Sequence, residues 1–450
     1  MVAEPTREQW SSQRAFLLAA IGSAVGLGNI WRFPYITGVN GGGAFVLVYC
    51  ACVAVIGAPL LMAEIAIGRR GGKSPVGTMR TLSQTEHTSR FWESIGWQAI
   101  LAPTVGLMYY AVVAGWTMSY AATAFSGAFS SISDAAGAGA LFSGLTTDVP
   151  RMMFWHAAFM TATVVIVSAG VRDGLERAVK FAMPTLAAIL VVLVVYAAVT
   201  ADFVGGLRFL FTPDFGKLTP TVVLMAVGQA FFSVNVAVGA FITYSAYMPR
   251  NISIPRMAGM IAIADTGIAL LVGLVIFPLV LSYGLEPSEG PGLVFVTLPI
   301  AFAQMPAGAV FGSLFFVLMA IAAVTSAIGM LEPPVSWLVE HKGLRRRPVA
   351  VVTGGVMWLL GIPALLSFNV LADFRPVAEK NMFELMDFLA ANLVIPAGGF
   401  LIAVYAGWVL SKDTLRDELG LTDGVTFRVL HFIMRFVAPV AIALVFVAAL

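Results

Sequence analysis

Long apolar segments, repeated eleven times along the chain, constrain its fold more than any other feature. A helix needs about 20 apolar residues to cross the hydrocarbon core of a bilayer. Segments that meet this requirement lie at 14–36, 43–68, 95–125, 152–170, 178–200, 219–247, 257–284, 306–338, 348–367, 384–411 and 428–449. Only 11% of the 450 residues are charged, whereas soluble domains have roughly 25%. The sequence therefore predicts an all-α integral membrane protein with eleven transmembrane helices.

The positively charged residues fall mainly in alternate loops between these segments. With the N-terminal segment, that set of loops carries Arg7, Arg14, Arg69, Arg70, Lys73, Arg80, Arg90, Arg172, Arg177, Lys180, Arg250, Arg256, Lys342, Arg345, Arg346, Arg347, Lys412 and Arg416. Loops on the cytoplasmic side of a membrane carry an excess of Lys and Arg. We therefore predict a multi-pass protein of the cell inner (plasma) membrane, with its N-terminus in the cytoplasm and its C-terminus outside.

The residues give no support to several other classes of function. Cys50 and Cys52 lie two apart in one predicted helix and point away from each other, which predicts neither a disulfide framework nor a metal site. The sequence has no Gly-x-Ser-x-Gly or His-Glu-x-x-His motif, and its four histidines are scattered. We expect neither an enzyme nor an organic cofactor, and no basic tract suggests nucleic acid.

The first predicted span contains residues that membrane helices usually avoid. Gly22, Gly26 and Gly28 weaken a helix, and an intramembrane Arg such as Arg32 is costly unless it faces water or a partner. Gly22 and Gly26 also match the small-xxx-small pattern of helix packing. Packing explains the glycines, whereas a broken helix also explains Asn29 and Arg32.

The sixth predicted span repeats this anomaly, with Gly228, Gln229, Ser233, Asn235 and Gly239 at mid-membrane depth. Polar residues that join neighbouring helices are the alternative explanation. Spans one and six correspond if the chain is one transporter domain (1–450) with a first repeat at about 10–200, a second at about 218–411 and an extra helix at about 428–449. Paired interrupted helices in two repeats indicate the substrate site of a secondary transporter.

Two runs in the first third of the chain carry a family resemblance. The runs GLGNIWRFPY at 26–35 and NGGGAF at 40–45 resemble the first-span signature of the neurotransmitter:sodium symporters, and the chain looks like a bacterial amino-acid transporter of the leucine-transporter type. GAPL at 57–60, QAFFS at 229–233 and TSA at 325–327 continue the resemblance. It implies an inverted five-plus-five repeat with broken helices 1 and 6, flanked by spans three and eight.

The resemblance also implies two sodium sites. The first consists of the Ala24 carbonyl, the Asn29 side chain, Ser233 and Asp265, completed by the carboxylate of the substrate, which makes it the shared site. The second consists of the carbonyls of Gly22, Val25 and Ala322 with the hydroxyls of Thr325 and Ser326. Because the substrate completes the first site, sodium and amino acid should each raise the other's affinity. Back-bonding of Thr325 and Ser326 to the preceding helical turn is the alternative.

Asp265 departs from the family pattern, because animal members more usually have Asn there. Those members balance the two sodium charges with chloride, at positions equivalent to Tyr49, Gln229, Ser233, Asp265 and Ala269. Since Asp265 already supplies a negative charge, we expect chloride not to be required. The alternative is a protonated or solvated Asp265 in a water-filled vestibule.

Where this chain has Gly26, monoamine carriers have an Asp that takes the place of a substrate carboxylate. Because this chain lacks that Asp, the resemblance implies a substrate that brings its own carboxylate. The residues implied to bind it are Ala24, Gly26, Gly28, Gly106, Tyr110, Phe232, Ser233, Asn235, Val238, Ser326 and Met330. Gly106 and Val238 are small and Met330 is adaptable, which favours a bulky apolar or aromatic side chain. Tyr110 and Phe232 as ordinary core aromatics are the alternative.

The same resemblance implies two gates, one on each side of the membrane. Arg32 and Asp387 match the extracellular gate pair; Arg7 and Glu340 match the intracellular pair, next to Trp10 and Tyr247. Solvated charges flanking the membrane are the alternative for Arg7 and Glu340. In span five, Gly174 and Pro184 weaken the helix, so this segment is expected to unwind and admit water to the sodium at Thr325.

The predicted function is sodium-coupled symport of a hydrophobic, bulky or aromatic L-amino acid into the cell by alternating access, with two sodium ions. A channel or a carrier of another small carboxylate is the rival. The expected partners are the amino acid and membrane lipid, in a monomer or dimer. The preferred amino acid, the sodium count and proton antiport are left open.

Overall fold

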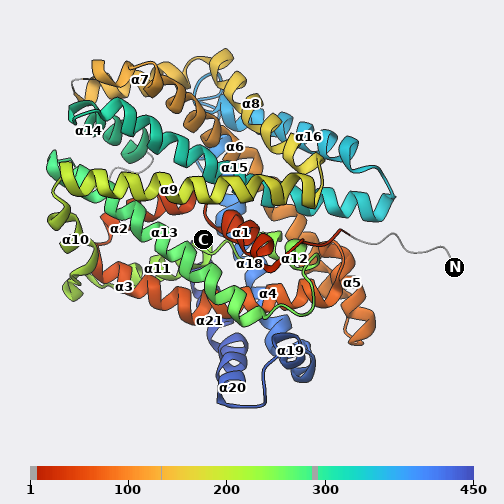
Figure 1. Cartoon of the computed structure of the whole chain (residues 1–450). Helices are drawn as coiled ribbons and strands as arrows, with labels where there is room; N and C mark the ends of the chain where they lie inside the picture. The colour runs from red at the N-terminus through yellow and green to blue at the C-terminus, as the bar shows by residue number, and fades with distance from the viewer. Residues whose placement is uncertain (1–7, 133, 286–291, 450) are drawn as a thin grey trace.

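The computed structural model describes residues 8–132, 134–285 and 292–449 as a bundle of helices (Figure 1). The α-helices are α1 (Gln13–Ala24), α2 (Phe33–Val39), α3 (Gly43–Cys52), α4 (Ala58–Gly71), α5 (Pro75–Thr85), α6 (Glu93–Phe125), α7 (Ala135–Thr146), α8 (Val149–Ser168), α9 (Arg177–Thr200), α10 (Phe203–Phe211), α11 (Pro220–Ser233), α12 (Ala240–Ser245), α13 (Ile254–Ser282), α14 (Leu298–Gln304), α15 (Gly308–Lys342), α16 (Arg346–Leu366), α17 (Met382–Asp387), α18 (Ile395–Val404), α19 (Lys412–Leu419), α20 (Val425–Phe432) and α21 (Ala438–Ala449). Short π-helical stretches join several of them: η1 (Gly28–Arg32), η2 (Val53–Gly57), η5 (Val171–Glu176), η7 (Leu293–Thr297), η8 (Phe388–Val394), η9 (Tyr405–Val409) and η10 (Ile433–Val437).

The predicted spans agree with the observed helices. Within the described residues, 9 continuous helices are long and apolar enough to cross a membrane, and the bent pair formed by residues 13–24 and 28–39 makes a tenth. The remaining predicted span, 219–247, consists of the two short helices α11 and α12. The all-α membrane fold and its broken first and sixth spans are therefore confirmed.

Proline explains most of the π-helical stretches inside the spans. η1, η2, η7, η8 and η10 are each followed directly by a helix whose second residue is proline: Pro34, Pro59, Pro299, Pro396 and Pro439. Proline has no N–H, so it leaves one carbonyl of the preceding turn without its usual donor. A local π-bulge accommodates that loss and lets the span continue.

The loops opposite the predicted cytoplasmic loops contain more structure than the hydropathy pattern indicated. α7, α10 and α14 lie in loops that the sequence predicted only as connections. Each is shorter than a membrane span, so a search for spans misses them. α10 packs against α13 and α3, and α14 packs against α15.

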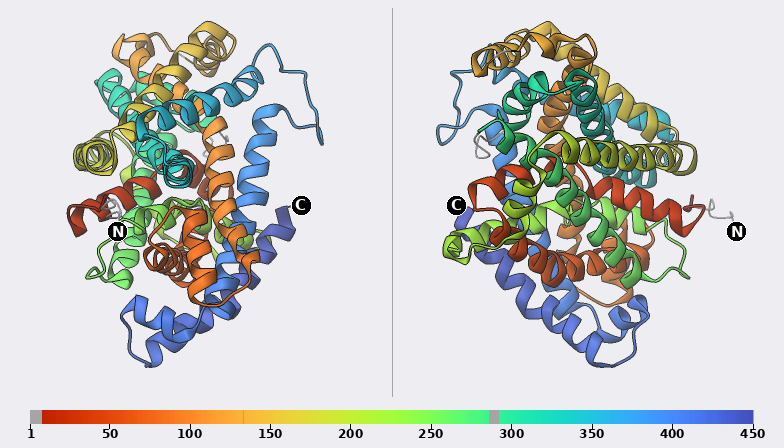
Figure 2. Two further views of the ribbon diagram at one scale, coloured as in Figure 1. Left: turned by 90° about the vertical axis from the view of Figure 1, so that its right-hand side faces the viewer. Right: turned by 60° about the vertical axis from the view of Figure 1, so that its left-hand side comes forward.

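The long helices α6 and α15 pack along each other in the middle of the molecule, and α6 reaches both breaks through hydrogen bonds of Tyr110 with Leu27 and of Gln98 with Ala237. α1 contacts α15, α13 and α9, whereas α12 contacts α4 and α15. Figure 2 (left) shows α9 nearly end-on, at the edge of the bundle. This arrangement confirms the prediction that spans three and eight flank spans one and six.

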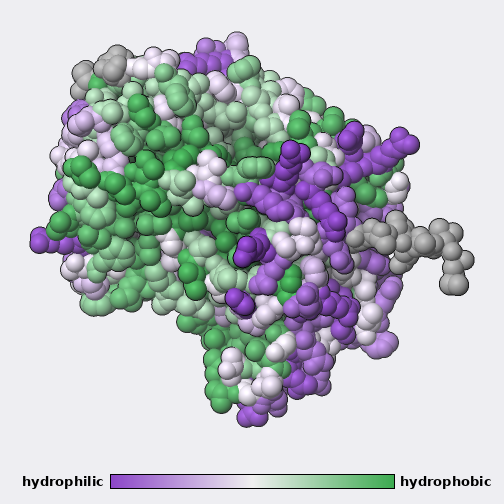
Figure 3. All heavy atoms as spheres, viewed as in Figure 1, coloured by the Kyte–Doolittle hydropathy of each residue, from purple (hydrophilic) through white to green (hydrophobic). Residues whose placement is uncertain are grey.

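The outer surface is suited to lipid. Figure 3 shows a broad hydrophobic surface over α9, α13 and α3, and a hydrophilic region at the end of the molecule where the described chain begins. Large apolar side chains on this surface are exposed, among them Phe181 (72%) and Val199 (79%). We call the end that contains Trp10 the Trp10 end, and the other the opposite end.

Candidate functional site

The first broken helix opens at residues 25–27. α1 ends at Ala24, Val25 adopts an extended conformation (φ −73°, ψ 104°), and the chain becomes helical again at Gly28 with a change of direction of 52°. The last carbonyls of α1 lack intrahelical donors. They are therefore available to a ligand at the centre of the bundle.

The second broken helix opens between α11 and α12. Asn235 (φ 57°), Ala237 (φ 65°) and Gly239 (φ 82°) all lie in the left-handed region. This conformation costs roughly 1–2 kcal/mol for a residue with a side chain, so the surrounding structure must hold it in place.

Two buried side chains that we did not predict as functional hold this segment. The Ala237 N–H donates to Glu64 Oε2 at 2.9 Å, and Gln98 Nε2 donates to the Ala237 carbonyl at 2.7 Å. Gln98 also donates to the Val394 carbonyl at 3.1 Å and so joins the broken helix to the tenth span. The signal in the sequence that could have identified them is a carboxyl and an amide inside apolar spans.

A buried cluster of polar side chains joins the two breaks. Asn29 Nδ2 donates to Asp265 Oδ1 at 2.7 Å and to Ser233 Oγ at 3.1 Å. The Ser233 hydroxyl donates to Asp265 Oδ2 at 2.6 Å, and the Tyr49 hydroxyl lies 2.9 Å from Ser233 Oγ. All four side chains are at most 1% exposed. The structure thus brings together Asn29, Ser233 and Asp265, as the first predicted sodium site requires.

The residues of the second predicted sodium site also meet. Ser326 Oγ lies 3.1 Å from the Val25 carbonyl oxygen and 3.4 Å from that of Gly22. Thr325 Oγ1 lies 3.0 Å from the Ala322 carbonyl oxygen of its own helix. A hydroxyl that spans two helices, as Ser326 does, goes beyond back-bonding, whereas Thr325 has the back-bonded geometry that we gave as the alternative.

The predicted substrate residues border the first break. A Cβ atom on Gly28 would lie 2.8 Å from the Phe232 ring, and one on Gly26 would lie 3.1 Å from the Tyr110 hydroxyl and closer still to Ser326 Oγ. The Leu27 N–H donates to the Tyr110 hydroxyl at 3.3 Å. Glycine is therefore required at both positions by close packing.

Three further predicted substrate residues differ in their surroundings. The side of Gly106 that would carry a Cβ faces Met330 Cε at 3.9 Å, and Val238 is buried at 2% exposure. Asn235 is engaged elsewhere, because its Nδ2 donates to the Ser23 carbonyl at 2.8 Å. This amide therefore ties the second break to the end of α1 and leaves its oxygen for any contact with a ligand.

A cavity of about 240 Å³ lies above Tyr110 and Phe232, toward the opposite end. Arg32 and Asp387, the predicted gate pair, both line it. Within the described chain they form no direct ion pair; instead the Arg32 guanidinium lies 4.2 Å from the centre of the Phe232 ring. The two gate residues thus face one water-accessible space.

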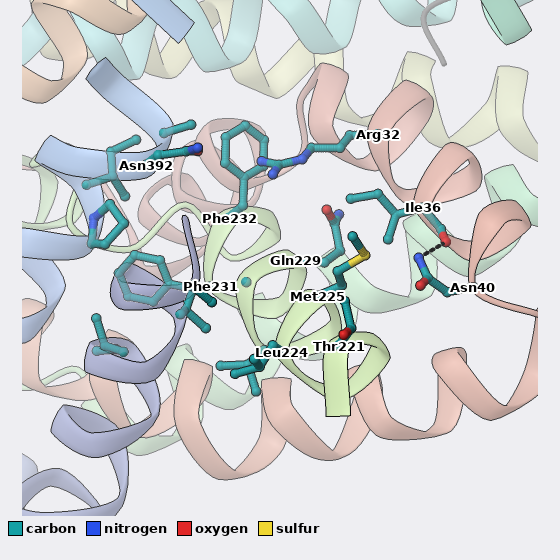
Figure 4. A pocket seen from close by; sticks show the side chains of 18 of the residues that line it. Arg32, Ile36, Asn40, Thr221, Leu224, Met225, Gln229, Phe231, Phe232 and Asn392 are labelled. Atoms are coloured by element: carbon teal, nitrogen blue, oxygen red, sulfur yellow. Dashed lines mark hydrogen bonds between the residues drawn. The ribbon is translucent and has the colours of Figure 1, made fainter. Parts of the chain in front are cut away.

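A larger cavity of about 580 Å³ lies behind Phe232, between α2, α11, α18 and α21 (Figure 4). Its wall includes Gln229, which points between Ile36 and Phe232. The Gln229 amide is buried and makes no hydrogen bond within the described chain. Although we expected Gln229 at the position equivalent to a chloride site, its amide does not hydrogen-bond with the Asn29–Ser233–Asp265 cluster.

At the Trp10 end the centre of the bundle is closed. Trp10 is 2% exposed, its Nε1 donates to the Tyr244 carbonyl at 2.8 Å, and its N–H donates to the Tyr247 carbonyl at 3.2 Å. Glu340 accepts from the Ser74 N–H at 2.7 Å. Arg7, the predicted partner of Glu340, lies outside the described residues.

Other charged groups support this closure. The Tyr247 hydroxyl donates to Glu332 Oε1 at 3.0 Å, and Glu332 also pairs with Arg346.

The predicted unwinding between Gly174 and Pro184 is absent from this conformation, because η5 and α9 are continuous there. η5 is held to the N-terminal segment by hydrogen bonds between Ser11 and Glu176.

Comparison with known proteins gives one consistent result. The model of the "Sodium:neurotransmitter symporter family" matches residues 7–133 and 145–450. The chain is 37% identical over 448 residues to an uncharacterized sodium-dependent transporter, YhdH, of Bacillus subtilis, covering 99% of this chain and 98% of that protein. It is 32% identical over 459 residues to an uncharacterized sodium-dependent transporter of Haemophilus influenzae, with 98% of each chain covered. Among solved structures, the crystal structure of MhsT in complex with L-phenylalanine matches with a TM-score of 0.90 and 41% identity, covering 99% of this chain and 100% of that one.

Proposed function

The chain belongs to the sodium:neurotransmitter symporter family, and we propose that it carries a bulky hydrophobic or aromatic L-amino acid into the cell together with two sodium ions and without chloride. The observation that carries this proposal is the buried cluster at the two breaks. Asn29, Ser233 and Asp265 place oxygen atoms beside the freed end of α1. Freed carbonyls and polar side chains at broken helices are what sodium-coupled transporters use to bind their ions.

The first sodium is held by the Ala24 carbonyl, Asn29, Ser233, Asp265 and the carboxylate of the substrate. The second is held by the Gly22, Val25 and Ala322 carbonyls and the Thr325 and Ser326 hydroxyls. The short distances from Ser326 to both α1 carbonyls support the second site. The Thr325 hydroxyl can bind sodium through an oxygen lone pair while it donates its proton to a carbonyl of its own helix.

The amino acid lies beside Gly26 and Gly28, with its carboxylate at the Tyr110 hydroxyl. The Tyr110 hydroxyl already accepts a hydrogen bond from the Leu27 N–H, and its own O–H can donate to a carboxylate. The side chain of the substrate enters the space bounded by Gly106, Phe232, Val238 and Met330. The complex of the 41% identical MhsT with L-phenylalanine supports an aromatic ligand of this size.

Alternating access proceeds by opening one end of the bundle at a time. Here the Trp10 end is closed by Trp10, Tyr247 and Glu340, whereas a cavity reaches Tyr110 and Phe232 from the opposite end. With the N-terminus in the cytoplasm, this conformation is closed to the cytoplasm. Arg32 and Asp387 close the other side when substrate binds. This gate can reopen, because charge pairs in exposed positions gain only about 0–1 kcal/mol and separate easily.

Uptake into proteoliposomes tests this function. A sodium gradient should drive saturable accumulation of L-phenylalanine or L-tryptophan in chloride-free buffer, and a potassium gradient should not. Uptake that rises linearly with substrate concentration would favour the channel, and accumulation of simple carboxylates without an amino group would favour the other carrier.

A further inference from the structure

A cluster of positively charged groups lies where the tenth and eleventh spans meet near the Trp10 end. The Arg435 guanidinium lies 4.1 Å from the centre of the Trp408 ring and 5.5 Å from that of Phe436. The Trp408 indole N–H donates to the Arg435 carbonyl at 2.7 Å. Gly407 permits this contact, because a Cβ there would overlap the Arg435 backbone. Arg435 is therefore held at a fixed place on the surface.

This cluster has no acidic partner in the described part of the chain. The other arginines nearby are paired: Arg69 with Glu418, Arg416 with Asp413, and Arg428 with Asp423. Arg435 and Lys412 form no such ion pair among the described residues, and the buried Nε of Arg435 makes no hydrogen bond. The charges that act on the neighbouring His431 are those of Lys412 and Arg435, both positive. Lys412 and Arg435, with His431 beside them, thus form a cationic cluster that lacks a counter-charge.

The surface around the cluster is apolar and exposed. Trp408, Phe432 and Phe436 are 53%, 55% and 43% exposed. Apolar side chains continue the same stripe along α20 and α21: Val425, Val429, Val440, Leu444 and Val447. Figure 3 shows the projection formed by α19 and α20 as hydrophobic on one side and hydrophilic on the other.

The end of the tenth span places the cluster near one boundary of the membrane. Trp408 is the fourth residue of η9, with which the tenth span ends at Val409, and Lys412 begins α19 only three residues later. Because the Trp408 indole bonds to Arg435, both lie at this boundary. Tryptophan and arginine are typical of the zone between hydrocarbon and water.

We propose that Lys412, His431 and Arg435 bind the phosphate of an anionic phospholipid, whose acyl chains lie along the exposed part of the stripe on α21. In the proposed orientation, this lipid belongs to the cytoplasmic leaflet. The phosphate supplies the missing counter-charge, and basic pockets between helices are a known way of holding anionic head groups. A second copy of the chain fits less well, because a two-fold interface places the same patch on both subunits and would bring two uncompensated positive clusters together.

Thermal unfolding of the purified protein in detergent tests this site. Phosphatidylglycerol should raise Tm in a saturable way, because a ligand of the folded state stabilises it, whereas phosphatidylethanolamine and inorganic phosphate at equal concentration should not. In Arg435→Gln/Lys412→Gln the apparent Kd for phosphatidylglycerol should rise at least tenfold. The matched control is Arg428→Gln, which removes a paired arginine from the same helix and should leave that Kd unchanged.

A second measurement covers the case in which the double variant does not fold. Phosphatidylglycerol with brominated acyl chains should quench the fluorescence of Trp408, taken as the difference between the wild type and Trp408→Phe, more than brominated phosphatidylcholine does. Equal quenching by both lipids, or an unchanged Kd in the double variant, would overturn the proposal. So would an equal gain in Tm with inorganic phosphate, or a Tm that depends on protein concentration rather than on lipid, which would indicate self-association.

Discussion

Replacing Asp265 by Asn tests the charge balance of the first sodium site. Asp265 is fully buried and accepts hydrogen bonds from Asn29 Nδ2 at 2.7 Å and from Ser233 Oγ at 2.6 Å. Asparagine has the same shape and retains one carbonyl oxygen, but it removes the negative charge. The expected result is therefore a loss of sodium affinity without a loss of the fold.

The structure sets the size of this loss. A sodium ion held by Ser233 lies no more than about 5 Å from the Asp265 carboxylate, where two unit charges attract by at least about 3 kcal/mol at an effective dielectric constant of about 20. An energy of this size changes a dissociation constant by a factor of roughly a hundred. The sodium concentration for half-maximal uptake by Asp265→Asn should rise by about that factor.

Uptake in proteoliposomes with chloride or gluconate as the anion provides the measurement. Wild-type uptake should be equal in both salts, and chloride should rescue Asp265→Asn only in part, because Ala269 offers no hydroxyl to the anion. Ala269 lies one helical turn from Asp265 on α13, so Asp265→Asn/Ala269→Ser should be rescued further. If wild-type uptake fell steeply in gluconate, or if Asp265→Asn had normal sodium affinity, the charge argument would be wrong.

Three other substitutions test separate parts of the site. Replacing both Thr325 and Ser326 by Ala removes two proposed sodium ligands, so uptake should be abolished while Tm in detergent stays within a few degrees; normal uptake would return these hydroxyls to a purely structural role. Gly28→Ala places a Cβ 2.8 Å from the Phe232 ring and should weaken L-phenylalanine binding at least tenfold in a radioligand assay, a result that unchanged affinity would contradict. Gln98→Leu leaves the Ala237 and Val394 carbonyls without a donor, and since each buried unpaired group costs about 1–3 kcal/mol, Tm should fall by several degrees; an unchanged Tm would show that Gln98 does not hold the second break.

The spans could be predicted from the sequence because hydrocarbon requires long apolar helices. The positions of both breaks also followed, since Gly26 and Gly28 in the first span and Ser233 and Asn235 in the sixth have no place in a regular membrane helix. Short helices such as α7 and α10 could not be predicted in the same way. They are held by packing against α13 and other spans, and each is too short to meet the length that a span requires.

Which residues form the site was easier to predict than how they are arranged. Asn29, Ser233 and Asp265 meet as the family resemblance implied. The role of Gln98 could not be read from the sequence, since it depends on the left-handed conformation of Ala237, 139 residues away. The same holds for Asn235, whose amide group bonds to Ser23 in the fold.

The central claim is that one buried cation joins the protein to the carboxylate of its substrate. Equilibrium binding of L-phenylalanine to the purified protein over a range of sodium concentrations, paired with sodium binding over a range of L-phenylalanine concentrations, tests it most directly. The account predicts that each ligand raises the affinity of the other by the same factor, and that potassium supports no binding. Equal affinity for L-phenylalanine in sodium and in potassium would contradict it.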